Sequence, residues 1–267
     1  MLRYIVQRLI LGLLAVLTIA TVTFTLMHAV PGDPLKKDKA IPESVRKNLE
    51  ERYGLNKPLL EQYGLYMSKM FFHGDFGISF KQENRTVNDI IKNHFGTSAI
   101  LGITALLGAL LWGVILGVIA GLKRNKWQDY FAMVIAVIGI SIPAFVLAYL
   151  LQHALALNLQ ILPVGGWPRD NWPFDSWSDF SMLILPSMAL GMIVMSTIAR
   201  LMRSSMLEVN QQDYIKTAKA KGLSRMQIIL KHQIRNAILP IVVLFGPLFA
   251  GILTGTFTIE TIFGIPG

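Results

Sequence analysis

The chain has 267 residues, of which 53% are hydrophobic and only 15% are charged, and this is too apolar for an ordinary soluble domain. The formal net charge of +9 would suit a nucleic-acid-binding protein, but the basic residues fall in short loops between apolar runs, as in membrane proteins. The absence of cysteine excludes disulfides, thiol metal sites and cysteine nucleophiles. We therefore expect an all-α polytopic membrane protein that contacts membrane lipid and binds no nucleic acid.

The first apolar run covers residues 9–30 and follows Arg3 and Arg8. It is long enough for a transmembrane helix, which needs about 20 apolar residues, and it is longer than the core of a signal peptide. No small-x-small cleavage site follows it before Pro31. Residues 1–30 therefore predict an uncleaved first span whose N-terminus lies in the cytoplasm.

Residues 31–95 mix charges of both signs almost evenly, and long translocated loops largely escape the positive-inside rule. We therefore expect an extracytoplasmic subdomain here, with helices over residues 42–53 and 58–72. The histidines and aspartates of this segment are not spaced like a set of metal ligands, so no metal site is predicted.

A second apolar run, residues 97–122, carries small residues at every fourth position. On a helix these residues would line one face and let a neighbouring backbone approach closely, which predicts a central helix of a bundle. Chance is the alternative, because glycine and alanine are common in membrane helices. The residues of this ladder are Ala105, Ala109, Gly113, Gly117 and Gly121.

Three further spans are predicted, at about residues 129–157, 182–202 and 237–257. The short basic turn from Lys123 to Lys126 precedes the first of them, and the positive-inside rule places this turn in the cytoplasm. Each span contains a proline, which frees a backbone carbonyl and marks a kink. Such kinks could line a pathway or act as hinges, with plain helix packing as the alternative. The candidates are Ser141, Pro143, Pro186, Pro240 and Pro247.

The last predicted span also contains Gly251 and Gly255, whose spacing allows close packing against another helix. Residues 96–267 form the expected core of the protein. Five spans place the end of this sequence outside the cell, directly after a turn-like Ile-Pro-Gly. We expect a sixth helix to be missing from it.

The basic loop, residues 203–236, is the one long polar stretch with a strong positive excess, and apolar runs flank it. The positive-inside rule places it in the cytoplasm. Residues 213–221 have the composition of a short helix, Gly222 offers a left-handed stop, and Ser224-x-x-Gln227 can form a capping box on the next helix. We interpret the loop as a surface for a partner protein, with simple capping of a surface helix as the alternative.

The sequence contains no nucleophile–base pair, phosphate-binding glycine loop, metal-ligand spacing or carboxylate dyad. We therefore predict no catalytic residue, no metal and no cofactor bound by this chain. The spans hold almost no ionisable side chains away from their ends, whereas carriers coupled to protons or sodium usually keep such groups at mid-membrane. Energy for transport is therefore expected to arrive through the basic loop.

The segments DYIKTAKAKGLS, residues 213–224, and HQIRNAILP, residues 232–240, resemble the cytoplasmic EAA loop of ABC-transporter permeases. The form is similar to the B-type permease of the oligopeptide, dipeptide and nickel importer family. The similarity covers nearly the whole chain through MLRYIVQRLI, PGDP, YGLNKPLLEQY, GDFGIS, SIPAF, LPVGG and IETIFGIPG. Lys216 stands at the glutamate position of the general EAA pattern and Thr217 at its second small position, departures that fit the peptide subfamily.

This resemblance implies a type I ABC importer permease in the plasma membrane of a bacterium or archaeon, with a pathway for dipeptides or oligopeptides. The implied partners are a second, paralogous permease, two ATPase subunits that bind ATP and Mg, and an extracytoplasmic solute-binding protein. The basic loop would hold a coupling helix docked on one ATPase, with Ala218 permitting close approach. The implied coupling residues are Asp213, Tyr214, Lys216, Thr217, Ala218, Ala220, Lys221, Gly222, Leu223, Ser224 and Arg225.

Nickel and glutathione are the alternative substrates within the same family. Outside it, the alternatives are a secondary carrier that works without ATPase subunits, and a signalling or assembly protein whose loop recruits a partner without transport.

Overall fold

The structure is a computed structural model, and it describes residues 2–29, 54, 56–77, 79, 85–168, 173–254 and 257–267. The chain divides into two compact units, Met1–Lys92 and Asn93–Gly267, which we call unit 1 and unit 2 and describe separately. Every element assigned in the described residues is a helix, so the expected all-α architecture is confirmed.

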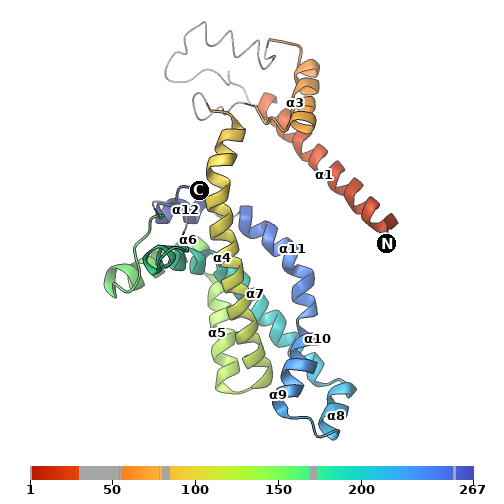
Figure 1. The fold of residues 1–267 in the computed structure, drawn as a ribbon, viewed down its shortest axis with the longest axis vertical. Helices are drawn as coiled ribbons and strands as arrows, with labels where there is room; N and C mark the ends of the chain where they lie inside the picture. Colours follow the sequence, from red (N-terminus) through yellow and green to blue (C-terminus); the bar gives the residue numbers. More distant parts are fainter. Residues whose placement is uncertain are drawn as a thin grey trace. The chain divides into compact units, whose positions relative to one another are not determined.

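Unit 1 contains α1 (Leu2–Ala29) and α3 (Leu59–His73), which meet near the last turns of α1 (Figure 1). The ring of Phe24 lies edge-on to that of Tyr63, with 5.4 Å between centroids, and Thr21 Oγ1 lies 2.8 Å from Tyr63 Oη. Most other side chains of α1 are exposed, as expected for a helix in lipid. The predicted helix over residues 58–72 is confirmed by α3, and the one over residues 42–53 lies outside the described residues.

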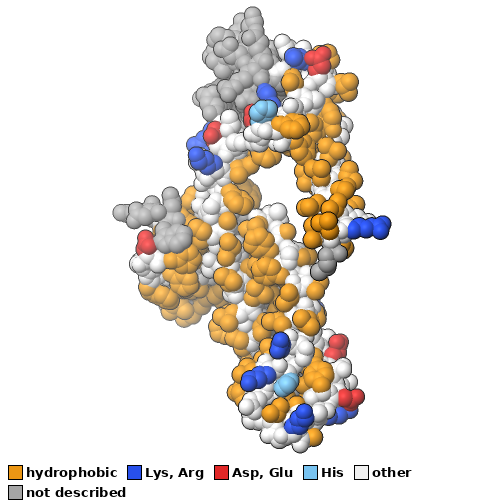
Figure 2. All heavy atoms as spheres, turned by 45° about the vertical axis from the view of Figure 1, so that its right-hand side comes forward, with side chains coloured by type: hydrophobic (Ala, Val, Ile, Leu, Met, Phe, Trp, Pro, Cys, Tyr) orange, Lys and Arg blue, Asp and Glu red, His pale blue; other side chains and the backbone are white. Residues whose placement is uncertain are grey.

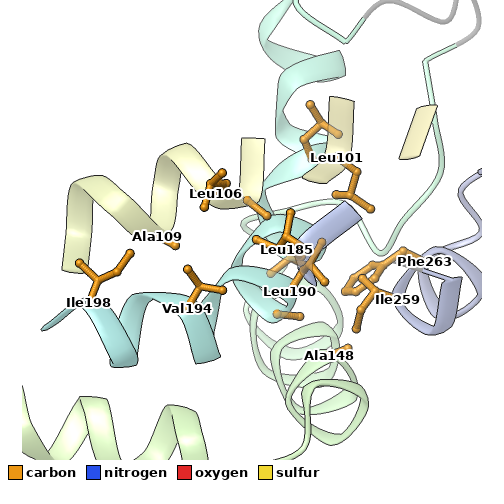
Figure 3. Packing of buried hydrophobic residues seen from close by; sticks show 14 of the residues in the cluster. Leu101, Leu106, Ala109, Ala148, Leu185, Leu190, Val194, Ile198, Ile259 and Phe263 are labelled. Atoms are coloured by element: carbon orange, nitrogen blue, oxygen red, sulfur yellow. The ribbon is translucent and has the colours of Figure 1, made fainter. Parts of the chain in front are cut away.

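Three long helices form the centre of unit 2: α4 (Val87–Leu122, within unit 2 from Asn93), α5 (Trp127–Ser141) and α7 (Trp177–Asn210) (Figure 1). The turn between α4 and α5 closes when the N–H of Lys126 donates to the carbonyl of Lys123 at 2.9 Å. This tight turn makes α5 antiparallel to α4. One continuous apolar core joins α4 and α7, whose side chains interdigitate in it (Figure 3), and α5 packs separately on α7.

A sharp corner follows α5, where a single kinked span over residues 129–157 was predicted. The axis of α5 and that of the following helical segment, Ala144–Asn158, differ by 113°. The cause is local: Ile142 (φ −95°, ψ 123°) and Pro143 (φ −56°, ψ 141°) both leave the helical conformation. A residue before proline is driven toward extended backbone, and two such residues in succession turn the chain instead of bending a helix.

The segment after the corner belongs to what we call the cap end of unit 2. It comprises α6 (Ala144–Leu151), the π-helix η1 (Gln152–Asn158), the loop 159–168 and α12 (Phe257–Phe263). In α12, Ile259 and Phe263 are buried in the same core as Leu185 and Leu190 of α7 and Ala148 of α6 (Figure 3). Elements far apart in the sequence therefore close this end together.

The opposite end of unit 2, the basic end, carries the α4–α5 turn and the basic loop. After α7 come α8 (Asp213–Ala220), α9 (Arg225–Gln227), the π-helix η2 (Ile228–Ile234), α10 (Arg235–Ala237) and α11 (Leu239–Thr254). Figure 2 shows charged side chains gathered around α8–α10, at the bottom of the view, whereas hydrophobic and uncharged atoms cover the part of unit 2 directly above them. Such a division between polar end and apolar flank fits a helix bundle in a membrane.

Three of the described helices, α1, α4 and α7, are long and apolar enough to cross a membrane. Two bent pairs raise the number of spans to five if each pair counts as one: Trp127–Ser141 with Ala144–Asn158, and Arg225–Ala237 with Leu239–Thr254, the second bent by 48°. The chain is therefore a polytopic helical protein, as the composition predicted.

Candidate functional site

The first half of the basic loop folds as the sequence predicted. The N–H of Gly222 donates to the carbonyl of Lys219 at 3.0 Å, and the N–H of Leu223 donates to the carbonyl of Ala218 at 3.3 Å. These two bonds form a Schellman motif, which requires a left-handed residue after the helix. Gly222 has a φ of +74°, a conformation that glycine adopts without steric cost. The predicted left-handed stop of α8 is confirmed.

The second half of the loop begins with the predicted capping box. Ser224 Oγ accepts a hydrogen bond from the N–H of Gln227 at 3.4 Å, and Gln227 Oε1 accepts one from the N–H of Ser224 at 3.1 Å. The box satisfies two backbone donors at the start of a helix that then passes through α9, η2 and α10. The loop is therefore a hairpin of two helices, in which the C-terminal end of the first and the N-terminal end of the second are capped.

A small apolar core holds this hairpin together. Ile215, Ala218 and Ile228 are buried against one another, and Val209 of α7 packs on them. Ala218 was expected to permit close approach of a partner, but its side chain faces the interior of the loop and is only 5% exposed. Its small size serves the packing of α8 on the following helix, because a larger side chain would push the two apart.

The base of the hairpin is also fixed. Gln233 of η2 is buried and its Nε2 donates to Oδ1 of Asn210, the last residue of α7. Breaking a hydrogen bond between two partly buried amides would leave both polar groups unpaired, which is costly. The contact therefore ties η2, in the second half of the loop, to the end of α7. The hairpin is therefore joined to the end of α7 both by this amide contact and by its apolar core.

The face of the hairpin away from this core is exposed and mixed in character. Tyr214 is 42% exposed, Met226 63% and Leu230 57%, so large apolar side chains lie in the open. Basic side chains surround them, and the one described ion pair on this face, Lys216 Nζ to Asp213 Oδ1 at 2.8 Å, is itself exposed. The predicted site residues that are exposed here are Asp213, Tyr214, Lys216, Thr217, Ala220, Lys221, Gly222, Leu223, Ser224 and Arg225.

Apolar anchors inside a polar rim are the composition of a protein-docking surface. Because the face lies at the polar end of unit 2, lipid does not explain its exposed aromatic and methionine side chains. The geometry therefore favours a protein partner at this position.

A partly buried ion pair, in which the arginine side chain is 28% exposed, lies at the same end. Asp129, at the start of α5, is 2% exposed, and both of its carboxylate oxygens accept hydrogen bonds from Arg203 of α7. The distances are 2.6 Å from Arg203 Nε and 2.8 Å from its second guanidinium nitrogen, and the N–H of Asn125 donates to the same carboxylate at 3.0 Å. This is the bidentate geometry that makes arginine–carboxylate pairs directional as well as strong. It pins the α4–α5 turn to α7.

The predicted small-residue ladder of α4 lies against the backbone of α7. A Cβ added to Gly113 would lie 2.8 Å from the carbonyl oxygen of Met195, and one added to Gly117 would lie 2.6 Å from that of Ala199. Gly121 continues the series, meeting the Cβ of Met206 at 2.5 Å. Successive glycines meet successive turns of α7 in the same chain direction, so α4 and α7 run parallel. Ala105 and Ala109 are buried in the core above them.

The remaining predicted residues are scattered. Gly251 is exposed with nothing within 4 Å of an added Cβ, so it packs on no helix of the described chain, and Gly255 lies outside the described residues. Pro186 is buried inside α7, which continues through it, and Pro247 lies exposed within α11. Pro240 occupies the first turn of α11, where a missing N–H costs little. Ser141 and Pro143 lie at the 113° corner.

Several structural residues had no signal in the sequence. Asp129 and Arg203 are 74 positions apart and were interpreted only as the ends of two spans. Gly139 of α5 meets Ser196 of α7, whose oxygen lies 2.2 Å from an added Cβ, and Gly165 similarly meets the carbonyl of Phe263. A single glycine or a single charge carries no periodicity, so only an alignment of relatives could have paired them.

Comparison with known proteins gives matches over the whole chain. Residues 113–267 match the family described as binding-protein-dependent transport system inner membrane component, and residues 1–102 match the N-terminal family of the same membrane components. The chain is 46% identical over 267 residues to the dipeptide transport system permease protein DppB of Bacillus subtilis. It is 42% identical to the oligopeptide transport system permease protein OppB of Salmonella typhimurium and 38% to DppB of Lactococcus lactis.

Each of these alignments covers 100% of the chain and 83–84% of the relative. The resemblance seen in the sequence is confirmed, and with it a multi-pass inner-membrane location and a role as a transport subunit. The chain belongs to the binding-protein-dependent transport system inner membrane components, the permeases of ABC importers.

Proposed function

We propose that the chain is one of two permease subunits of an ATP-driven importer, and that it forms part of a membrane pathway for dipeptides or oligopeptides. The observation that carries the proposal is the full-length similarity, at 38–46% identity, to permeases named for dipeptide and oligopeptide transport. No relative cited here is named for nickel or glutathione, so those substrates have no comparable support.

In this proposal the partners are a second, paralogous permease, two ATPase subunits that bind ATP and Mg, and an extracytoplasmic solute-binding protein. The exposed face of the basic loop is the docking site for one ATPase. Tyr214, Met226 and Leu230 would enter its surface, and Lys216, Lys221 and Arg225 would form the polar rim. Gly222 sets the bend between the two helices of the hairpin and thereby the angle at which they are presented.

We also propose that the basic end faces the cytoplasm. The α4–α5 turn with its Lys123, Arg124 and Lys126 and the basic loop lie at the same end of unit 2, and short basic loops stay inside. With α1 as one span, the N-terminus would then also be cytoplasmic. The cap end would face outward, toward the solute-binding protein.

Orientation is testable because the chain contains no cysteine. Lys126→Cys and Lys219→Cys at the basic end and Asp175→Cys at the other end place single thiols at exposed positions. In intact cells a membrane-impermeant maleimide should label only the third variant, and all three should react after lysis. Labelling of Lys126→Cys in intact cells would reverse the proposed orientation.

The transport function is tested with the complete complex in proteoliposomes, with the solute-binding protein outside. We expect uptake of a labelled di- or oligopeptide that requires ATP and stops when the ATPase subunits are left out. Uptake without ATPase subunits would indicate a secondary carrier. ATP-dependent uptake of nickel or glutathione, without uptake of peptide, would show that the substrate is one of these alternatives in the same family. A complex that binds ATPases but transports nothing would contradict the proposal.

A further inference from the structure

The ion pair between Asp129 and Arg203 has a more precisely defined geometry than the stability of the fold requires. Replacing a buried ion pair by apolar side chains of similar volume often leaves a protein equally stable, because desolvation offsets the attraction of the charges. What a bidentate arginine–carboxylate pair adds is geometry, since two parallel hydrogen bonds fix both the distance and the angle between two groups. In this chain the two groups belong to α5 and α7.

The pair lies on the route by which movement of the basic loop reaches the bundle. The loop is fixed to the end of α7 through the buried amide contact of Gln233 with Asn210 and through its apolar core on Val209. Arg203 lies about two helical turns before Asn210 on the same helix. A displacement of the loop is therefore carried along α7 to Arg203, past Met206, which packs on Gly121 of α4.

From Arg203 the displacement can pass to α5 by a rigid connection. Asp129 lies in the first turn of α5, and the N–H of Asn125 holds its carboxylate from the α4–α5 turn. The far end of α5 is the 113° corner that leads into α6 at the cap end. The loop is also joined to α11, through a helical segment bent by 48°.

We propose that Asp129 and Arg203 are positioning residues for energy coupling, which transmit movement of the basic loop from α7 to α5 and so to the cap end. The proposal rests on the proposed function, because it assumes that an ATPase moves the loop. Neither residue would contact substrate or nucleotide. Their task is to keep α5 in register with α7 while the loop is displaced.

The test uses the complete complex in proteoliposomes and measures peptide uptake and ATP hydrolysis on the same preparation. The wild-type complex first tests the proposed function, and only if it couples uptake to hydrolysis are the variants compared with it. The variants are Asp129→Asn, Arg203→Gln and the double variant, with Arg200→Gln as control. Arg200 is an exposed arginine of α7 close to Arg203.

We expect the single variants to assemble in lower yield, because each leaves one polar partner unpaired. The double variant removes both charges and should recover the yield. All three should transport about fivefold less peptide per ATP hydrolysed than the wild type, whereas Arg200→Gln should leave the ratio unchanged. Arg203→Lys keeps the positive charge but loses the two parallel hydrogen bonds, so its ratio of peptide transported to ATP hydrolysed should lie between those of Arg203→Gln and the wild type.

The double variant decides the matter. If it recovers both yield and the wild-type ratio of peptide to ATP, the pair is only a structural pin and the proposal is wrong. A fall in uptake that is matched by an equal fall in hydrolysis would also overturn it, because that pattern reports fewer working complexes and no loss of coupling.

Discussion

At the basic end of unit 2 the polar contacts between elements are made mainly by side chains, whereas at the cap end a close crossing of two backbones adds to the apolar core and to the hydrogen bond from Gln152 Nε2 to the carbonyl of Val164. The basic end uses a bidentate ion pair, a capping box and a buried amide contact. The cap end uses the N–H of Gly166, which donates to the carbonyl of Phe263 at 2.7 Å, with Gly165 crossing the same carbonyl. The close backbone crossing leaves no room for a side chain at Gly165.

The difference fits the proposed function, in which the basic end moves as one body with an ATPase subunit. A docking surface under load needs internal stiffness but also needs to shift as a body, which polar contacts with defined directions permit. At the cap end, by contrast, the contact between the backbones of loop 159–168 and α12 is either made or broken. The variants below should damage one end and spare the other.

The largest effect is expected from Gly165→Val at the cap end. An added Cβ would lie 2.3 Å from the carbonyl oxygen of Phe263, and backbone cannot yield as a flexible side chain does. Loop 159–168 should detach from α12, at a cost of about 3 kcal/mol. Thermal unfolding of the purified complex measures the loss, with Gly246→Ala as control because nothing lies within 4 Å of an added Cβ there.

The same variant sharpens the comparison of the two ends. Proteolysis should become faster in loop 159–168 while the ATPase subunits stay bound through the basic loop. If the ATPase subunits were lost together with the closure, the two ends would not be separable in this way.

The next effect concerns the helices that join the two ends. Gly117→Ala would bring a methyl group within 2.6 Å of the carbonyl of Ala199 and 2.5 Å of the Cβ of Met202. We expect a loss of about 2 kcal/mol, because α4 and α7 must move apart. Gly108→Ala on the same helix meets nothing within 4 Å and should be neutral or slightly stabilising. Equal melting temperatures for both variants would show that the ladder is incidental.

How far the sequence predicts this protein depends on the distance between interacting residues. The α8 helix, its left-handed end at Gly222 and the capping box at Ser224 lie within a few residues of their causes, and all were predicted. The ladder of α4 was visible as a period, although its partner helix was not. Asp129 and Arg203 each appeared as ordinary charges at the ends of spans, because a single charged residue gives no sequence signal that identifies its partner.

The corner at Pro143 shows a second limit. Proline in an apolar run predicts a kink or a break, and the choice depends on whether the preceding residue stays helical. Ile142 leaves the helix here, whereas α7 continues through Pro186. Burial of Pro186 between neighbouring helices is compatible with its continuity, and that packing is a tertiary property.

A smaller effect is expected from Gly222→Val at the basic end. An added Cβ meets nothing within 4 Å, so the only cost is the left-handed conformation, about 1–2 kcal/mol for a β-branched residue. The hairpin should open and bind the ATPase subunits less tightly, while the cap end keeps its stability. Gly222→Asn is the matched control, because asparagine adopts this conformation more readily. Normal co-purification of ATPase subunits with Gly222→Val would argue against a role of the bend in docking.

The smallest effect tests the capping box at the same end. Ser224→Ala removes one acceptor, but the bond it loses is long, at 3.4 Å, and exposed, so the cost should be about 0.5 kcal/mol. Hydrogen exchange of the amides at the start of α9 should quicken about twofold, and Ser224→Asp, which can still cap, should restore the slower rate. If alanine exchanges as slowly as serine, the cap contributes nothing, and the hairpin is held by its other contacts, among them the core of Ile215, Ala218 and Ile228.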